Sequence, residues 1–372
     1  MKIGVPKEIK PQENRVAITP AGVHQLSSHG HEIMIEAGAG IGSGISDQDY
    51  IDAGAKMLPT AADTWAAAEL LLKVKEPIES EYQFLREDQV VFTYLHLAAD
   101  KEQTDALLKS RTTAIAYETV QCSDGYLPLL APMSEVAGRL STLVGSNHMM
   151  KPFGGNGKLI TGVPSVAPAK VVVIGAGTAG QNAARVAYGL RSDVTIFDIN
   201  LQRLAQIDAE YSGHVKTMYS TEHAIAEAIS DADLVIGSVL VPGARTPKLV
   251  SDAMIAQAKP GTVFVDIAVD QGGCFEGTHA TTHEDPTYPI HDAIIYAVAN
   301  MPGAVPYTST YALTNATLSY VTKIADKGWQ KALHDDPALA KGLNTYRGQL
   351  TNQPVADAWG YQAISLDSVL AA

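Results

Sequence analysis

The sequence has 372 residues, of which 46% are hydrophobic and 18% charged, a composition typical of a compact globular protein long enough for two domains. Its 27 basic and 40 acidic residues give a formal net charge of −13, which disfavours nucleic acid and anionic membrane surfaces as partners. Because the N-terminus lacks the apolar core of a signal peptide and no apolar run approaches the roughly 20 residues of a membrane span, we expect a cytoplasmic protein.

Short apolar runs alternate with helical segments in the first third of the chain. Helices are expected at Pro20–His29 and Lys101–Ser110. The alternation is typical of a parallel sheet with crossover helices. The expected strands are Lys2–Val5, Glu32–Glu36, Glu69–Val74, Val90–Leu95 and Thr113–Tyr117.

A second series of strands follows a Gly- and Pro-rich stretch at Lys151–Pro168, which we interpret as a loop. The number of strands equals that of a complete dinucleotide-binding fold. They are expected at Lys170–Ile174, Asp193–Phe197, Val215–Tyr219, Leu234–Val239, Thr262–Ile267 and Ile294–Val298.

After Pro306 we expect helices at Tyr311–Trp329 and Pro337–Leu350 and no further strands. These helices need a sheet to cover, and the first series has few helices of its own. The sequence therefore predicts an α/β protein with two doubly wound Rossmann-like domains, in which the second domain is inserted into a discontinuous first domain.

The two cysteines, Cys122 and Cys274, stand far apart and have no Cys or His nearby at metal-ligand spacing. We therefore expect no disulfide framework and no metal site. Both thiols are predicted to be buried and inert.

A glycine pattern, G-x-G-x-x-G, begins directly after the strand at 170–174 and leads into a helix. Gly175 permits a sharp turn, Gly177 lets backbone amides approach a pyrophosphate, and Gly180 lets the helix pack close to the strand. Asp198 ends the next strand and is the expected acceptor for a ribose hydroxyl. A carboxylate there favours NAD over NADP, although Arg203, five residues on, is a possible partner for a phosphate.

Polar residues also stand where other strands end, and ligands of α/β sheets bind outside the carboxyl ends of strands. In the first series these are Lys75, His96 and Glu118, and in the second they are Asp270 and Asn300. Each alone is equally explained as a helix cap or a satisfied core group. Their shared location predicts a hydride-transfer site with His96 and Lys75 on one wall and Asp270 on the other.

With these residues in place, the sequence resembles the alanine dehydrogenase family over nearly its whole length. Long co-linear blocks carry the resemblance: Met1–Glu8, Arg15–Pro20, Lys73–Pro77, Thr93–Leu97, Pro132–Arg139, Val265–Gly273 and Asn300–Pro306. The resemblance implies a substrate domain of residues 1–128 and 307–372, an NAD-binding domain of residues 129–306, and a homohexamer. One departure is His279, where these enzymes often carry an arginine.

The resemblance also implies the reversible NAD-dependent conversion of L-alanine and water to pyruvate and ammonia. Arg15 and Lys75 are then expected to hold the substrate carboxylate, with His96 and Asp270 as catalytic groups, and Tyr94, Leu130 and Met133 around the substrate methyl group. The cofactor contacts expected from the motif and the resemblance are Ser134, Gly175, Gly177, Thr178, Ala179, Gly180, Asp198, Arg203, Ser220, Val239, Leu240, Ile267, Asp270, Val298, Asn300 and Met301.

The residue types suit this chemistry. An arginine fork and a second cation orient a carboxylate, and an imidazole that titrates near neutrality transfers protons. Three alternatives stay open: the nucleotide-binding subunit of a transhydrogenase, a non-catalytic NADH-binding sensor, and a 2-hydroxy-acid dehydrogenase. Retention of Arg15, Lys75, His96 and Asp270 favours a working substrate site over the first two.

Overall fold

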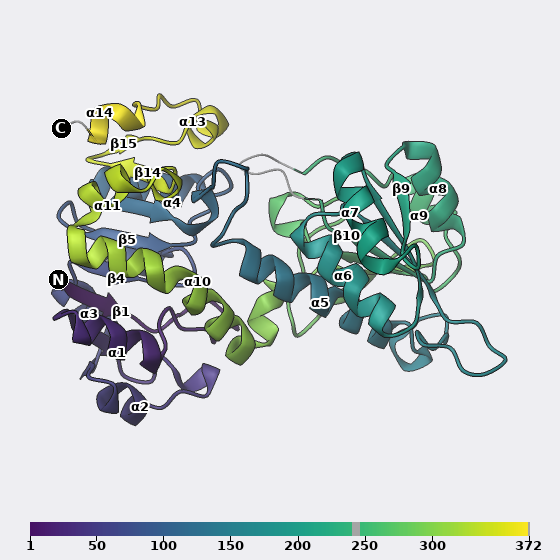
Figure 1. Cartoon of the computed structure of the whole chain (residues 1–372), viewed down its shortest axis with the longest axis horizontal. Helices are drawn as coiled ribbons and strands as arrows, with labels where there is room; N and C mark the ends of the chain where they lie inside the picture. The colour runs from purple at the N-terminus through teal and green to yellow at the C-terminus, as the bar shows by residue number, and fades with distance from the viewer. Residues whose placement is uncertain (240–245, 371–372) are drawn as a thin grey trace. The chain divides into compact units, whose positions relative to one another are not determined.

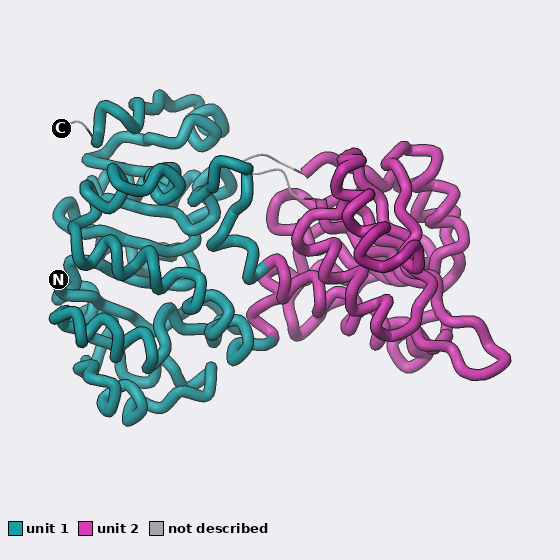
Figure 2. Tube along the Cα trace, viewed as in Figure 1, with its two compact units in different colours: residues 1–133, 305–372 teal, residues 134–304 magenta. Residues whose placement is uncertain are grey.

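The computed structural model describes residues 1–239 and 246–370. The chain forms two compact units, each with its own sheet (Figure 2). Unit 1 comprises residues 1–133 and 305–372, and unit 2 comprises residues 134–304. Unit 2 is therefore an insertion in the chain of unit 1, and the predicted α/β class with an inserted domain is confirmed.

The sheet of unit 1 has eight strands in the order β15-β14-β6-β5-β4-β1-β2-β3. The six strands β1 to β6 are parallel, whereas β14 runs antiparallel to both β6 and β15. The strands are β1 (Lys2–Val5), β2 (Glu32–Glu36), β3 (Lys56–Leu58), β4 (Leu70–Leu72), β5 (Val90–Thr93), β6 (Thr113–Ala116), β14 (Leu343–Tyr346) and β15 (Gln349–Leu350).

The strand order of unit 1 reverses between β1 and β4, which pair directly. The segments that follow these two strands therefore diverge to opposite sides, the arrangement at which doubly wound sheets bind ligands. The segment after β1 carries Arg15 and the segment after β4 carries Lys75, so the topology brings both cations to one sheet edge.

Helices of unit 1 come from both parts of the chain, and Figure 1 shows α10 and α11 on one face of the sheet. Gln25 of α1 donates a side-chain hydrogen bond to Thr322 of α10 at 3.3 Å, which ties the two parts together. The helices are α1 (Pro20–Ser28), α2 (Asp47–Asp52), α3 (Ala61–Ala67), α4 (Lys101–Ser110), α10 (Pro306–Lys327), α11 (Trp329–Asp335), α12 (Pro337–Ala340), α13 (Gln353–Trp359) and α14 (Leu366–Leu370).

The predicted helix at Pro337–Leu350, and the expectation of no strands after Pro306, are wrong. Helix α12 ends at Ala340, and the chain then forms the hairpin of β14 and β15. Arg347 and Gly348 between them have φ of 47° and 79°, the left-handed conformation that a two-residue hairpin turn requires. Because β14 pairs with β6, more than 200 residues away along the chain, no local pattern indicates it.

The sheet of unit 2 has seven strands in the order β12-β13-β11-β10-β7-β8-β9, all parallel except β12. All of the predicted strands are present, and the antiparallel β12 was not predicted. The strands are β7 (Lys170–Ile174), β8 (Asp193–Asp198), β9 (Lys216–Tyr219), β10 (Leu234–Gly237), β11 (Val263–Asp266), β12 (Thr287–Ile290) and β13 (Ala293–Tyr296), and the helices are α5 (Ala131–His148), α6 (Thr178–Gly189), α7 (Leu201–Tyr211), α8 (Glu222–Ser230) and α9 (Asp252–Ala256).

The core of unit 2 lies on both faces of this sheet. Along β7, Val171 and Val173 pack into one apolar cluster, whereas Val172 and Ile174 pack into the other. Because both faces are covered, β7 has an unbroken apolar sequence rather than an alternating one. This strand fixes the position of the glycine turn that follows it.

Two further expectations concern membranes and thiols. Within residues 1–239 and 246–370, none of the helices combines the length and apolar character that crossing a bilayer requires. Cys274 is fully buried as predicted, and burial raises the pKa of its thiol. Cys122 is only half-buried, so the prediction of full burial is wrong for this residue.

Candidate active site

Lys75 and His96 lie just beyond the carboxyl ends of β4 and β5. Glu8, which follows β1, is buried and accepts the backbone N–H groups of Val74 at 2.6 Å and Lys75 at 3.3 Å. The backbone carbonyl of Lys75 in turn accepts the hydroxyl of Thr93 at 3.0 Å. These bonds fix the chain after β4, so the Lys75 side chain starts from a rigid position.

His96 has a left-handed backbone, with φ of 52°, and its side chain is one-third exposed. The Glu118 carboxylate holds this conformation by accepting the N–H groups of His96 at 2.6 Å and Leu95 at 3.2 Å. The ring of Tyr94 is stacked with the imidazole, with centroids 5.9 Å apart and planes 8° from parallel. Backbone strain that the surroundings hold in place is typical of functional sites.

Tyr94 is buried, and its hydroxyl donates a hydrogen bond of 2.5 Å to the Leu129 carbonyl. Burial raises the pKa of Tyr94 well above its usual value, although nearby Arg15 opposes the shift. The phenol therefore stays neutral, and its fixed ring packs against one face of the imidazole. Leu130, the next residue after this carbonyl, is half-buried and directly precedes α5.

Glu76 is a carboxylate of the site that the sequence analysis did not single out. Its side chain is 12% exposed and forms ion pairs with Lys10 and, at 3.9 Å, with Lys75. Burial alone raises the pKa of Glu76, but Lys75, Lys10 and His96 together lower it to about 2. The four groups thus form one electrostatic cluster, and the only sequence signal for Glu76 was its place directly after Lys75.

Arg15 is fully buried and paired with Glu13, which the sequence analysis also missed. Its Nε and Nη2 atoms donate to the two Glu13 oxygens at 2.7 and 2.5 Å, and its Nη1 atom donates to the sulfur of Met133 at 3.0 Å. The structure therefore brings the predicted residues Arg15 and Met133 into contact. The bidentate pair fixes the orientation of the guanidinium group.

Beneath this cluster lies a second buried ion group. Lys73 is 1% exposed and donates to Glu81 at 2.9 Å and to Glu8 at 3.2 Å. Burial lowers the pKa of Lys73, but the two carboxylates outweigh it and raise the pKa. Lys73 is thereby satisfied in the core, whereas Lys75, two residues on, extends to the sheet edge.

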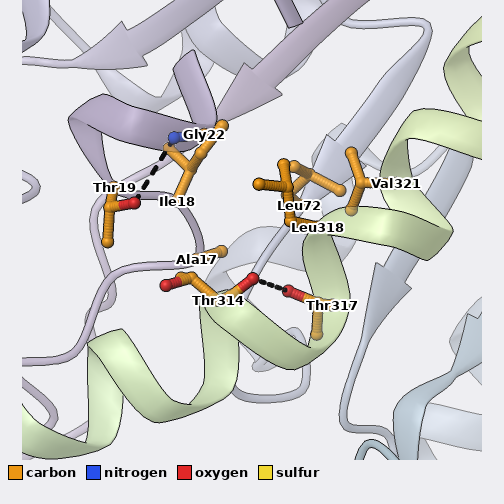
Figure 3. Close-up of a pocket in the computed structure, with 9 residues that line it drawn as sticks. All are labelled: Ala17, Ile18, Thr19, Gly22, Leu72, Thr314, Thr317, Leu318 and Val321. Carbon is orange, nitrogen blue, oxygen red and sulfur yellow. Dashed lines mark hydrogen bonds between the residues drawn. The ribbon is translucent and has the colours of Figure 1, made fainter. Parts of the chain in front are cut away.

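A small cavity in unit 1 is unsuited to a substrate. It lies between α1 and α10 and has a volume of about 10 Å³, which is room for about one water molecule (Figure 3). Its lining is mostly apolar, and it contains none of the predicted site residues. It is a packing defect beside Leu72 and Leu318.

In unit 2 the glycine turn has the predicted geometry. Gly175 has φ of 98°. A Cβ atom on Gly180 would stand 1.8 Å from the Gly175 carbonyl oxygen, so the start of α6 packs directly against the turn. A Cβ on Gly177, by contrast, would meet only Arg203 Nη1, at 3.8 Å. The backbone at Gly177 is therefore accessible to a ligand at the N-terminus of α6, and Thr178 and Ala179 form the first turn of that helix.

Asp198 and Arg203 both contact this turn. Asp198 ends β8, and its carboxylate accepts the N–H groups of Ala176 at 2.7 Å and Asn200 at 2.8 Å. Arg203 donates to the Ala176 carbonyl at 3.3 Å. The N–H group of Ser220 donates to the Asp198 backbone carbonyl at 3.0 Å, which places Ser220 at the neighbouring strand end.

Asp270 and Asn300 meet at the opposite side of this sheet edge. The Asp270 carboxylate accepts the N–H group of Asn300 at 3.3 Å, and Asn300 has a left-handed backbone with φ of 62°. Asp266, which sequence reasoning missed, is buried at the end of β11 and accepts the N–H groups of Ala268 and Cys274. These hydrogen bonds fix the loop that contains Asp270, which is exposed to solvent.

The other predicted cofactor residues are spread along the same edge or behind it. Val239 lies against Gly175, and Ile267 follows β11, where its N–H donates to Gly237. Val298 and Met301 pack their side chains in the core of unit 2. Ser134 is half-buried in α5. Leu240 lies outside the described residues.

The chain is similar to known proteins over both units. Residues 4–137 match the family model for the N-terminal domain of alanine dehydrogenase/PNT, and residues 141–353 match the model for its C-terminal domain. Alanine dehydrogenase of Mycolicibacterium smegmatis is 62% identical over 356 residues, which is 96% of each chain. An L-alanine dehydrogenase structure matches with a TM-score of 0.92 and 49% identity over 97% of this chain and 99% of that one. A transhydrogenase from Sinorhizobium meliloti matches with a TM-score of 0.78 and 26% identity over 95% and 99%.

The two doubly wound units, the glycine turn and the charged strand ends define an NAD(P)-type dehydrogenase of the α/β class. Within that class, the chain belongs to the alanine dehydrogenase/PNT family. The resemblance predicted from the sequence is thereby confirmed.

Proposed function

We propose that this chain catalyses the reversible reaction of L-alanine, NAD and water to give pyruvate, ammonia and NADH. Support comes from full-length relatives named alanine dehydrogenase and from the presence of Arg15, Lys75, His96 and Asp270. In this proposal unit 1 binds the substrate and unit 2 binds NAD. The units divide between residues 133 and 134 and between 304 and 305, whereas the sequence predicted boundaries at 128/129 and 306/307.

The residues of unit 2 fit a dinucleotide. The accessible backbone at Gly177, at the N-terminus of an α-helix, suits a pyrophosphate. In the proposed role, Asp198 at the end of β8 accepts ribose hydroxyls, and its charge disfavours the extra phosphate of NADP. Bound NAD supplies the hydride acceptor. Further contacts are assigned to the predicted set: Ser134, Thr178, Ala179, Gly180, Arg203, Ser220, Val239, Leu240, Ile267, Val298, Asn300 and Met301.

The residues of unit 1 fit a short amino acid. In the proposed roles, Arg15 and Lys75 attract and orient the carboxylate, because both are cations fixed by neighbouring carboxylates. Tyr94, Leu130 and Met133 surround the methyl group. Orientation of the Cα–H bond toward the hydride acceptor is the main contribution of this set.

Proton transfers fall to His96 and Asp270. The amino group must lose a proton before hydride leaves Cα, and water must then add to the imine and ammonia depart. His96 is partly exposed and rigidly held, which suits repeated proton exchange. Asp270 is exposed and carries a negative charge that balances the positive charge growing on nitrogen.

The test is an assay of NAD reduction with the purified full-length chain. We expect NADH absorbance to rise with L-alanine and far less with glycine, L-serine or L-lactate. Reduction of NAD by L-lactate instead would assign a 2-hydroxy-acid dehydrogenase. Binding of NADH without turnover of any of these substrates would contradict the proposal. We further propose that the protein is cytoplasmic and forms a homohexamer. Light scattering of the protein as it elutes from a size-exclusion column tests the oligomeric state.

A further inference from the structure

Two histidines and an aspartate form a compact group of ligand atoms on the surface of unit 1. His29 follows α1, His31 precedes β2, and Asp326 lies in the last turn of α10. His29 Nδ1 is 3.0 Å from one Asp326 carboxylate oxygen, and His31 Nε2 is 2.7 Å from the other. The three ligand atoms lie within 4.8 Å of one another. Among residues 1–239 and 246–370, no other three such side chains come together in this way.

The turn between α1 and β2 explains why both imidazoles point the same way. The backbone N–H groups of His29 and His31 both donate to the carbonyl of Leu26, at 3.2 and 3.1 Å. Gly30 between them has φ of 82°, which reverses the chain without a steric penalty. The two rings are consequently 6.4 Å apart, centroid to centroid.

The positions of Asp326 and of the His31 ring are also restrained by neighbouring contacts. Gln25 and Thr322 join α1 to α10 one turn before Asp326, so the carboxylate cannot drift away from the histidines. The amino group of Met1 lies 3.3 Å from Nδ1 of His31, so the amine must be uncharged or move aside when Nδ1 keeps its proton and Nε2 binds a cation. Ligands with restrained orientations lose less entropy when they bind a cation.

We propose that His29, His31 and Asp326 bind a zinc ion. Two imidazole nitrogens and one carboxylate oxygen are ligands that Zn²⁺ accepts, whereas Mg²⁺ and Ca²⁺ prefer oxygen alone. Tetrahedral zinc at about 2.0–2.1 Å from each ligand places them about 3.3 Å apart, so small side-chain rotations suffice. The ion displaces the protons that now link the imidazoles to the carboxylate.

The exposure of the group suits an ion that enters from solvent. The His31 side chain is 7% exposed, whereas those of His29 and Asp326 are 41% and 36% exposed. One ligand is therefore anchored in the protein, and the open side has room for a water molecule as the fourth ligand. This arrangement differs from a structural site closed by four protein ligands.

Zinc at this position would join the two separate parts of the chain that make up unit 1. Asp326 stands 295 positions after His31, and unit 2 is inserted between them. This separation is why the sequence, judged by local ligand spacing, predicted no metal site. Because an ion that binds the folded state alone stabilises it by mass action, zinc should raise the stability of unit 1.

The test uses the full-length chain, free of any histidine tag and stripped of metal with a chelator. The protein is dialysed against ZnCl₂, and bound zinc is measured by elemental analysis. Thermal unfolding of unit 1 is followed by tryptophan fluorescence, because Trp65, Trp329 and Trp359 all belong to that unit. His29→Gln and Asp326→Asn are the site variants.

His291→Gln is the matched control, since His291 lies 2.9 Å from the Asp252 carboxylate but, among the described residues, forms no group of three ligands. We expect the parent and control to bind zinc and to unfold at a higher temperature with it. Both site variants should bind zinc on the order of tenfold or more weakly and lose the shift. A parent chain that binds no zinc, site variants that bind it as the parent does, or an equal shift with MgCl₂ would each overturn the proposal.

Discussion

The Glu118 carboxylate accepts the backbone N–H of His96 at 2.6 Å and also lies 4.0 Å from the Nδ1 atom of the same residue. One carboxylate thus fixes the backbone of His96, the proposed proton-transfer group, and also lies beside its imidazole ring. A left-handed backbone such as that of His96 costs about 1–3 kcal/mol and persists only where its surroundings impose it. Glu118, which also binds the N–H of Leu95, is the group that imposes it.

Substitution Glu118→Gln should therefore lower kcat for L-alanine oxidation by about 100-fold, because small displacements of a catalytic group cost that much. The affinity for NADH should not change, since no cofactor contact is assigned to Glu118. Steady-state kinetics and NADH fluorescence titration measure the two quantities. Glu102→Gln, an exposed acidic residue of α4, is the control. Equal kcat in both variants would show that Glu118 does not position His96.

Glu76→Gln should change how the stability of unit 1 depends on pH. The pKa of Glu76 is lowered from 4.5 to about 2 in the folded chain, so its contribution is complete above about pH 4.5 and is lost as the pH falls toward 2. This linkage corresponds to about 3 kcal/mol. Urea unfolding followed by tryptophan fluorescence at a series of pH values should show a shallower acid loss in the variant than in the parent. Identical pH profiles would contradict the assigned ion pairs.

Gly180→Ala should weaken NADH binding by at least about tenfold and destabilise unit 2 by about 1–3 kcal/mol, since the added methyl group overlaps the Gly175 carbonyl. Helix α6 provides its own control at Gly189, where a Cβ atom meets nothing within 4 Å. Gly189→Ala should leave NADH binding intact and slightly stabilise the helix. NADH titrations of both variants check this, and undiminished binding by Gly180→Ala would mean that the turn is not the dinucleotide site.

Asp198→Gly should relax the preference for NAD over NADP by about tenfold or more, the scale of one charge-assisted hydrogen bond. Because Asp198 also braces the glycine turn through Ala176, absolute affinity for NAD should fall as well. Asp198→Asn removes the charge and retains an acceptor, so it separates the two effects. Ratios of kcat/KM for the two cofactors are the measurement, and unchanged selectivity in both variants would place the ribose elsewhere.

Much of unit 2 could be predicted because its signals are local. The apolar strand, the glycine turn and Asp198 all lie within about one βαβ unit, and each residue has a single clear physical role there. The antiparallel β12 was missed because its weak apolar pattern depends on pairing with β13.

The site in unit 1 was predicted only in part, since its key contacts are between residues of different segments. Lys75 and His96 were found from their places at strand ends. The partners Glu13, Glu76 and Glu118 are identified as partners only by distances in the fold. The hairpin of β14 and β15 was missed for the same reason, because its pairing with β6 overrides the local helical pattern.

The most direct test of the central claim is transfer of the Cα hydrogen of alanine to the cofactor. With L-alanine deuterated at Cα, mass spectrometry of the nicotinamide product should show reduced cofactor carrying one deuterium for each pyruvate formed by the parent chain. His96→Ala should still bind NADH but lose most of this transfer. Pyruvate formed without deuterium in the cofactor, or undiminished transfer by His96→Ala, would contradict the account.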